Sequence, residues 1–143
     1  MDLSSTTSDN LTEMLAKIIE FTERRQSLIT QNIVNVNEAG YLPKDLDVTG
    51  FAELMTNAVT EHVRNEHLLL RDSANIKFGA NGSFESLPIV DEEAKRLFQN
   101  DTRKYLKLQL EKLSENLLNN RIATQLLGQK QEQSSALSNI HLD

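Results

Sequence analysis

Apolar residues in the first part of the chain recur at every third or fourth position, the spacing of one helix face. They are Leu11, Met14, Leu15, Ile18, Ile19, Leu28, Ile29 and Ile33. The spacing predicts a helix over residues 10–36, with Asn10 and Glu13 forming a capping box at its start. The Ser/Thr-rich residues 1–9 lack this period and are expected to form a flexible tail. A helix of this kind needs a partner helix to cover its stripe.

The C-terminal part of the chain carries two such stripes on one predicted helix, within residues 100–143. The first stripe steps by four and three and consists of Leu106, Leu110, Leu113, Leu117, Asn120, Thr124 and Leu127. The second consists of Leu118, Ile122 and Leu126. One hairpin partner covers only one stripe, so we expect the first stripe to face the N-terminal helix and the second to form an intermolecular interface. In this arrangement Leu11, Leu15, Ile18, Ile29 and Ile33 pack against Leu106, Leu113, Leu117 and Leu127.

The region between the two long helices divides into a connector, residues 37–50, and a variable middle, residues 51–99. Gly40 suits a positive φ angle in the connector, and Pro43 favours an extended residue before it. Apolar residues from Phe51 onward predict a helix that runs to about Leu70, with Asp47 or Thr49 as its cap: Phe51, Leu54, Met55, Ala58, Val59 and Val63.

A loop or short hairpin is expected over residues 72–90, with a tight turn at residues 80–82. Asp91 then begins a short helix that pauses at residues 100–102. The predicted fold is therefore all-α: long N- and C-terminal helices paired as an antiparallel coiled-coil hairpin, with a shorter helix and an irregular loop between them.

Composition narrows the class of protein. The 143 residues suffice for one domain, and the absence of cysteine excludes disulfides and zinc-thiolate sites. With 38% hydrophobic residues, the chain favours an elongated or partner-dependent structure, and the net charge of -6 argues against nucleic acid as a partner. No apolar run is long enough for a membrane span, and no cleaved secretory signal is recognisable, which indicates a cytosolic protein or one exported with its N-terminus intact.

Candidate chemistry is sparse. His62, Glu66 and His67 superficially resemble a zinc motif, but the two histidines lie five positions apart and point about 140° from each other on a helix. Asp45 and Asp47 are more typical of a structural or capping role than of catalysis. No nucleotide-binding or serine-hydrolase motif occurs. The sequence therefore predicts no catalytic, cofactor-binding or metal-binding residue, no cofactor, and no enzymatic activity.

The segment QNIVNVNEAGY, residues 31–41, resembles the N-terminal signature of the bacterial flagellar basal-body rod and hook proteins. The matching residues are Asn32, Ile33, Asn35, Gly40 and Tyr41, whereas Gln31, Val34 and Val36 replace the usual alanines and Glu38-Ala39 replaces Thr-Pro. The continuation through Asp45, Asp47 and Phe51 to Met55 is similar to the proximal rod subunits of that family. The final helix is similar as well, at Asn116, Leu126, Leu127, Lys130, Ala136 and Ile140.

The resemblance implies a structural subunit of the proximal rod, which passes unfolded through the flagellar export apparatus without a cleaved signal peptide and stays in the periplasmic part of the basal body. Its implied partners are copies of itself, other rod subunits, and the membrane (MS) ring or its rod adaptor, and not nucleic acid. Asn32, Asn35 and Asn37 either lie beside neighbouring subunits or simply end the first helix. The alternative function is a soluble helical-bundle adaptor or secretion chaperone, because composition and periodicity permit it equally.

Overall fold

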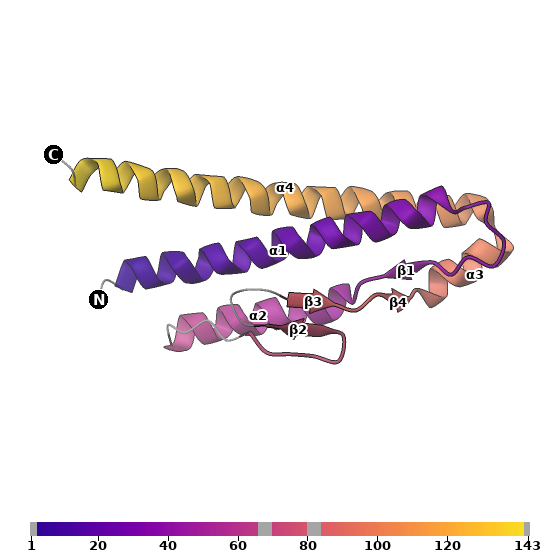
Figure 1. Cartoon of the computed structure of the whole chain (residues 1–143), viewed down its shortest axis with the longest axis horizontal. Coiled ribbons are helices and arrows are strands. Elements are labelled where there is room, and N and C mark those ends of the chain that lie inside the picture. The colour runs from indigo at the N-terminus through magenta and orange to yellow at the C-terminus, as the bar shows by residue number, and fades with distance from the viewer. Residues whose placement is uncertain (1–2, 66–69, 80–83, 142–143) are drawn as a thin grey trace.

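The computed structural model describes residues 3–65, 70–79 and 84–141. Its frame is a hairpin of two long helices, α1 (Leu3–Val34) and α4 (Thr102–His141). Thr22 contacts Asn116 while Asn32 contacts Gln109, so the two helices run antiparallel. Both ends of the chain accordingly lie at the same end of the molecule (Figure 1). The predicted helical hairpin is confirmed.

Shorter elements fill the chain between these helices. They are β1 (Lys44–Asp45), α2 (Val48–Asn65), β2 (Ile76–Phe78), β3 (Phe84–Ser86), β4 (Ile89–Val90) and α3 (Glu92–Asn100). β2 pairs antiparallel with β3, with Lys77 opposite Glu85, and β1 pairs antiparallel with β4, with Lys44 opposite Val90. The hairpin expected in 72–90 is thus present, although the turn expected at 80–82 lies outside the described residues.

Two predicted helix boundaries differ from the structure. α1 begins at Leu3, so most of the predicted tail is helical, and Asn10 lies inside the helix. Its side-chain nitrogen is 3.2 Å from Nδ1 of His62, so Asn10 contacts α2 and does not cap α1. Extending an existing helix by about two turns is far less costly than nucleating one, which explains the earlier start. α2 ends at Asn65, and residues 66–69 lie outside the described residues.

Aspartates fix the other helix starts. Asp47 caps α2 by accepting a hydrogen bond from the Gly50 amide at 2.9 Å, which decides between the two predicted caps. Asp91 caps α3 through the Ala94 amide, and Asp101 ends α3 and accepts from the Lys104 amide in the first turn of α4. The predicted pause between the last two helices therefore lies at Asp101, which ends α3 and caps α4.

The hydrophobic core lies on the α2 side of α1. It contains Met14, Phe21, Leu46, Phe51, Met55, Ala58, Ile76 and Phe84. The rings of Phe21 and Phe51 stack with their centroids 4.0 Å apart, and the Phe84 ring lies under the cations of Lys17 and Arg24. This core binds α2 and the β2–β3 hairpin to α1, and α4 contributes no residue to it.

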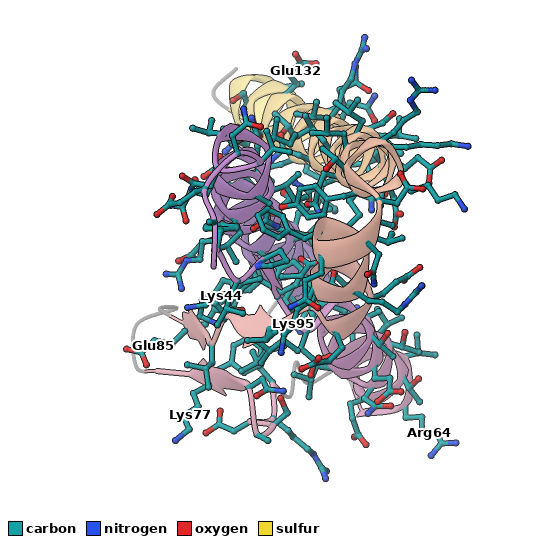
Figure 2. All side chains as sticks on the ribbon, turned by 90° about the vertical axis from the view of Figure 1, so that its right-hand side faces the viewer. Lys44, Arg64, Lys77, Glu85, Lys95 and Glu132 are labelled. Atoms are coloured by element: carbon teal, nitrogen blue, oxygen red, sulfur yellow. The ribbon has the colours of Figure 1, made fainter. Side chains whose placement is uncertain are left out.

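α1 is the central helix of the molecule. Figure 1 shows α4 along one side of it and α2 along the other. In the view along the long axis, Glu132 of α4 and Arg64 of α2 lie at opposite edges with α1 between them (Figure 2). α4 therefore meets the rest of the chain through a contact separate from the core.

Candidate assembly surface

The face of α4 that contacts α1 is polar. Its buried residues are Tyr105, Gln109, Asn116 and Ala123, with Lys112 half-buried between them. We call Tyr105, Gln109, Lys112 and Asn116 the polar seam. Each lies one position before a residue of the predicted leucine stripe. The period was therefore predicted correctly and its phase was wrong.

The predicted packing of Leu106, Leu113, Leu117 and Leu127 against α1 is accordingly wrong. Leu117 is 45% exposed, Leu106, Leu113 and Leu127 are only half-buried, and Leu110 is 55% exposed. On the α1 side, Ile29 is fully buried, whereas Leu11, Leu15, Ile18 and Ile33 are half-buried. The reason lies in the polar groups that face α4, the carbonyls of Thr22 and Asn32 and the carboxylate of Asp45, which need hydrogen-bond partners that leucines cannot supply.

Asn32 is the centre of the hydrogen bonds that hold the connector. It is 2% exposed. Its side-chain nitrogen donates to the Lys44 carbonyl at 2.8 Å and to Gln109 Oε1 at 3.0 Å, while its side-chain oxygen accepts from the Tyr41 hydroxyl at 2.8 Å and from the Lys44 amide. The Tyr105 hydroxyl donates to the Asn32 carbonyl at 2.7 Å. One side chain thus joins α1, the connector and α4.

The other residues of the family signature are placed around Asn32. Gly40 has a φ angle of +78°, as predicted, and allows the connector to turn back. Asn35 donates to the Gln31 carbonyl at 2.9 Å in the last turn of α1. Ile33 is half-buried and Asn37 exposed. Of the two alternatives for the asparagines, Asn32 and Asn35 act within the chain, at the end of the first helix.

A second polar cluster crosses the seam at Asp45. Arg25 of α1 donates to both carboxylate oxygens of Asp45, at 2.9 and 3.2 Å, and Lys112 of α4 donates to Asp45 at 2.9 Å and also to Asp91. Burial favours the neutral form of Asp45, but the hydrogen bonds and charges of Arg25 and Lys112 outweigh it and hold the pKa of the carboxyl below its usual value. The cluster ties β1, α1, α4 and the start of α3 together.

Burial also shifts the tyrosines at this end of the hairpin. It raises the pKa of Tyr105 to about 12, with a smaller contribution from Tyr41 and Asp91. Burial likewise raises the pKa of Tyr41. The Tyr105 ring packs edge-on against Phe98 of α3 at 5.1 Å. Both hydroxyls stay protonated and act as hydrogen-bond donors, a structural role.

The outer faces of α4 are apolar and exposed. On one flank lie Leu106, Leu110, Leu113 and Leu117, which we call the leucine ridge; Arg103 and Lys107 line a shallow hollow beside it. On the other flank lie Leu118, Ile122 and Leu126, exposed by 58%, 47% and 45%. The prediction that these three residues stay uncovered within the chain is confirmed.

The second flank forms one wall of an apolar groove between α1, α2 and α4, with a volume of about 400 Å³. Leu15 and Ile18 of α1 form its floor, Ile122 and Leu126 of α4 one wall, and Val48, Ala52 and Met55 of α2 the other. At helical spacing from Ala52, Val59 and Val63 continue the α2 wall and are 43% and 75% exposed. We did not predict this wall from the sequence. Its signal in the sequence is weak, because residues such as Ala52 and Val59 are small.

Within the described residues, the structure brings together no group of acidic or histidine side chains suited to a metal ion. His62 contacts Asn10, and the other residues of the weak zinc-like motif, Glu66 and His67, lie outside the described residues. None of the described helices is long and apolar enough to cross a membrane.

Comparison of the chain with models of protein families, with curated proteins and with solved structures finds no match.

Proposed function

We propose that this protein is a non-enzymatic structural subunit of the proximal rod of the bacterial flagellar basal body. In this role it links the membrane ring to the distal rod, with copies of itself and other rod subunits as neighbours. It reaches the periplasmic part of the basal body through the flagellar export apparatus, without a cleaved signal peptide.

The observation that carries the proposal is the exposed apolar surface of α4. Leu110, Leu117, Leu118, Ile122 and Leu126 are each between 45% and 58% exposed. Monomeric proteins rarely leave two apolar flanks of one helix to water, which supports a role in which a partner covers them. A subunit completed only in the assembly has this property.

The signature segment supplies the second support. Two residues that carry the resemblance, Asn32 and Tyr41, belong to one hydrogen-bond network, in which Asn32 also binds Lys44 and Gln109. Gly40, which precedes Tyr41 at the end of the signature, has a positive φ angle of +78°, a conformation that glycine readily adopts. The proposal is supported by the structural roles of these residues within the chain.

The direct test is mass spectrometry of purified hook-basal bodies from the source organism, together with a motility assay of the deletion strain. We expect the chain at several copies per particle and loss of motility on deletion. Absence from the particles, with normal motility, contradicts the proposal and favours a folded helical adaptor.

A substitution test separates assembly from export. The double variant Leu118→Glu/Ile122→Glu places two charges on the exposed stripe and should block rod assembly while the chain is still exported. The matched control is Asn57→Glu/Thr60→Glu, which adds the same charge on the exposed polar face of α2. A working rod built from the Leu118/Ile122 variant contradicts the assignment of this stripe.

A further inference from the structure

We propose that copies of this chain join head to tail, with the leucine ridge on α4 of one copy seated in the groove between α1, α2 and α4 of the next. This inference rests on the proposed function, because it requires a subunit that assembles with its own copies. It adds which two surfaces meet. Both surfaces belong to the same chain, which is why we choose a second copy as the occupant.

The dimensions of the two surfaces match. The groove follows α1 from Arg25 to Leu15, about 15 Å at the helical rise. The ridge extends from Leu106 to Leu117, about 16 Å. Its leucines step by four and three, the spacing with which one helix inserts side chains between those of its neighbours. The groove lacks one helix of a closed bundle, and the ridge supplies a helix face of the right length.

The charges at the matching ends are complementary. The ridge begins beside Arg103 and Lys107, which line the hollow next to Leu106 and Leu110. The groove continues past Val48 into a polar hollow that contains Asp47 and Glu92, and Glu92 is exposed. With both copies pointing the same way, the basic start of the ridge meets the acidic head of the groove. Charge therefore favours a parallel orientation of the copies.

The positions of the two surfaces on α4 determine how the assembly grows. At about 100° per residue, the ridge and the groove wall of Ile122 and Leu126 point roughly 170° apart around α4. One partner cannot occupy both flanks at once, so a second copy leaves its own groove open. The ridge also lies about ten residues, or roughly 15 Å, ahead of the groove along the helix. Such a staggered contact does not close, and it generates a growing chain of subunits.

Disulfide cross-linking tests the contact directly, because the natural chain has no cysteine. The double variant Leu110→Cys/Ala52→Cys places one thiol on the ridge and one on the α2 wall of the groove. At the proposed stagger these residues lie level with each other, within the span that a disulfide bridges. Oxidation of the full-length variant should give a ladder of dimers, trimers and longer species on a denaturing gel.

The matched control is Leu110→Cys/Asn57→Cys. Asn57 is exposed, lies on the same helix, and points about 140° away from Ala52. It should give no ladder, and neither single variant should form more than a trace of dimer. A dimer from Leu110→Cys alone, or equal ladders from both pairs, overturns the proposed contact.

Sedimentation of the unmodified protein separates failure of the contact from failure of the function. If the protein associates with rising concentration but Leu110→Cys/Ala52→Cys does not cross-link, the ridge-to-groove contact is wrong and the proposed function stands. If the protein stays monomeric at all concentrations, both are contradicted. With the contact correct, Leu110→Glu should weaken association about 10- to 100-fold, the effect of losing one buried leucine.

Discussion

The inner and outer faces of α4 are opposite in character to those of an ordinary surface helix. The inner face carries Tyr105, Gln109 and Asn116, each 1% exposed or less, whereas Leu110, Leu117, Leu118 and Leu126 on the outer faces are 45–58% exposed. In a self-contained protein the hydrophobic effect produces the reverse distribution. The difference is the arrangement expected if, as proposed, a partner covers the outer leucines while polar groups position α4 on α1.

The two faces also differ in what they contribute energetically. Buried hydrogen bonds and ion pairs add little net stability, because water hydrates the same groups in the unfolded chain, but breaking one side of a pair is costly. The polar seam therefore fixes which residues of α1 and α4 meet. In the proposed assembly, each outer leucine that becomes fully buried would add about 1.5–3 kcal/mol of stability.

The largest effect on the inner face is expected for Asp45→Ala. This change leaves Arg25, whose side chain is 6% exposed, without its carboxylate, and removes a partner of Lys112. Loss of one member of a buried ion pair costs about 3–5 kcal/mol of the free energy of unfolding. Urea denaturation followed by circular dichroism measures it. The control Glu20→Ala breaks a half-exposed pair with Arg24 and should cost at most about 0.5 kcal/mol. Equal losses in the two variants contradict the account.

Asn32→Ala should have the second largest effect. It removes the partner of the Lys44 backbone, of Tyr41 and of Gln109, so the expected loss is about 2–3 kcal/mol of unfolding free energy. Asn35→Ala is the matched control, since Asn35 makes one exposed hydrogen bond within α1 and its loss should cost less than about 1 kcal/mol. The same denaturation experiment distinguishes them, and a milder effect of Asn32→Ala than of Asn35→Ala contradicts a central role for Asn32.

The contribution of the Asp45 carboxylate to the free energy of unfolding should depend on pH, and its lowered pKa sets the direction. Its pKa is lowered in the folded chain from the ordinary 3.8, so the unfolded chain takes up the proton first. The stability it provides is therefore fully present above about pH 4 and is lost as the pH falls through the lower, folded pKa. The difference in unfolding free energy between the natural chain and Asp45→Asn should be constant near neutral pH and shrink in acid. A difference that grows in acid contradicts the ion pair.

The cluster around Asp45 should also lose stability at alkaline pH, because Lys112 then loses its charge. Burial disfavours the charged form of Lys112, but Asp91 and Asp45 outweigh burial and raise its pKa above the ordinary 10.5. Its contribution is therefore complete below that value and is lost as the pH rises through the folded pKa. Lys112→Met should remove this alkaline loss from the unfolding free energy, whereas Lys107→Met on the exposed flank should leave it unchanged.

The smallest effect on the inner face is expected for Gln109→Met. Among the described residues, Gln109 Nε2 is buried with no hydrogen-bond partner, so the side chain already bears an unsatisfied donor. Methionine has a similar volume and removes that donor, although Asn32 loses an acceptor, and the two effects should cancel to within about 1 kcal/mol. A loss as large as that of Asn32→Ala in urea denaturation contradicts this balance.

Periodicity predicted the helices because each apolar stripe repeats over several turns. Local chemistry predicted an acidic helix start at Asp91, offered Asp47 as one of two caps, and predicted the positive φ angle of Gly40. Periodicity did not predict which face of α4 contacts α1. The ridge and the seam differ by one residue, a rotation of about 100°, and the stronger stripe, which carries Leu110 and Leu117, is the exposed one. The seam is polar because it binds groups distant in sequence, such as the Thr22 and Asn32 carbonyls of α1 and the Asp45 carboxylate, and no local pattern reveals such a contact.

The candidate surface was predicted in part for the same reason. Leu118, Ile122 and Leu126 lie on a stripe that a two-helix hairpin cannot cover, so their exposure followed from helix geometry. The groove required knowing that α2 packs beside α1, which depends on the stacking of Phe21 on Phe51 and on Phe84 from the β2–β3 hairpin. Aromatic residues in separate segments give no sequence signal of their pairing.

The most direct test of the central claim, that the outer leucines serve a partner and not the monomer, is sedimentation velocity of Leu110→Glu/Leu117→Glu beside the natural chain. The account predicts that the natural chain associates as its concentration rises, while the variant stays monomeric, with its helical content unchanged and its unfolding free energy altered by no more than about 0.5 kcal/mol. A variant that unfolds would place these leucines in the core of the monomer. One that associates as the natural chain does would remove them from the interface.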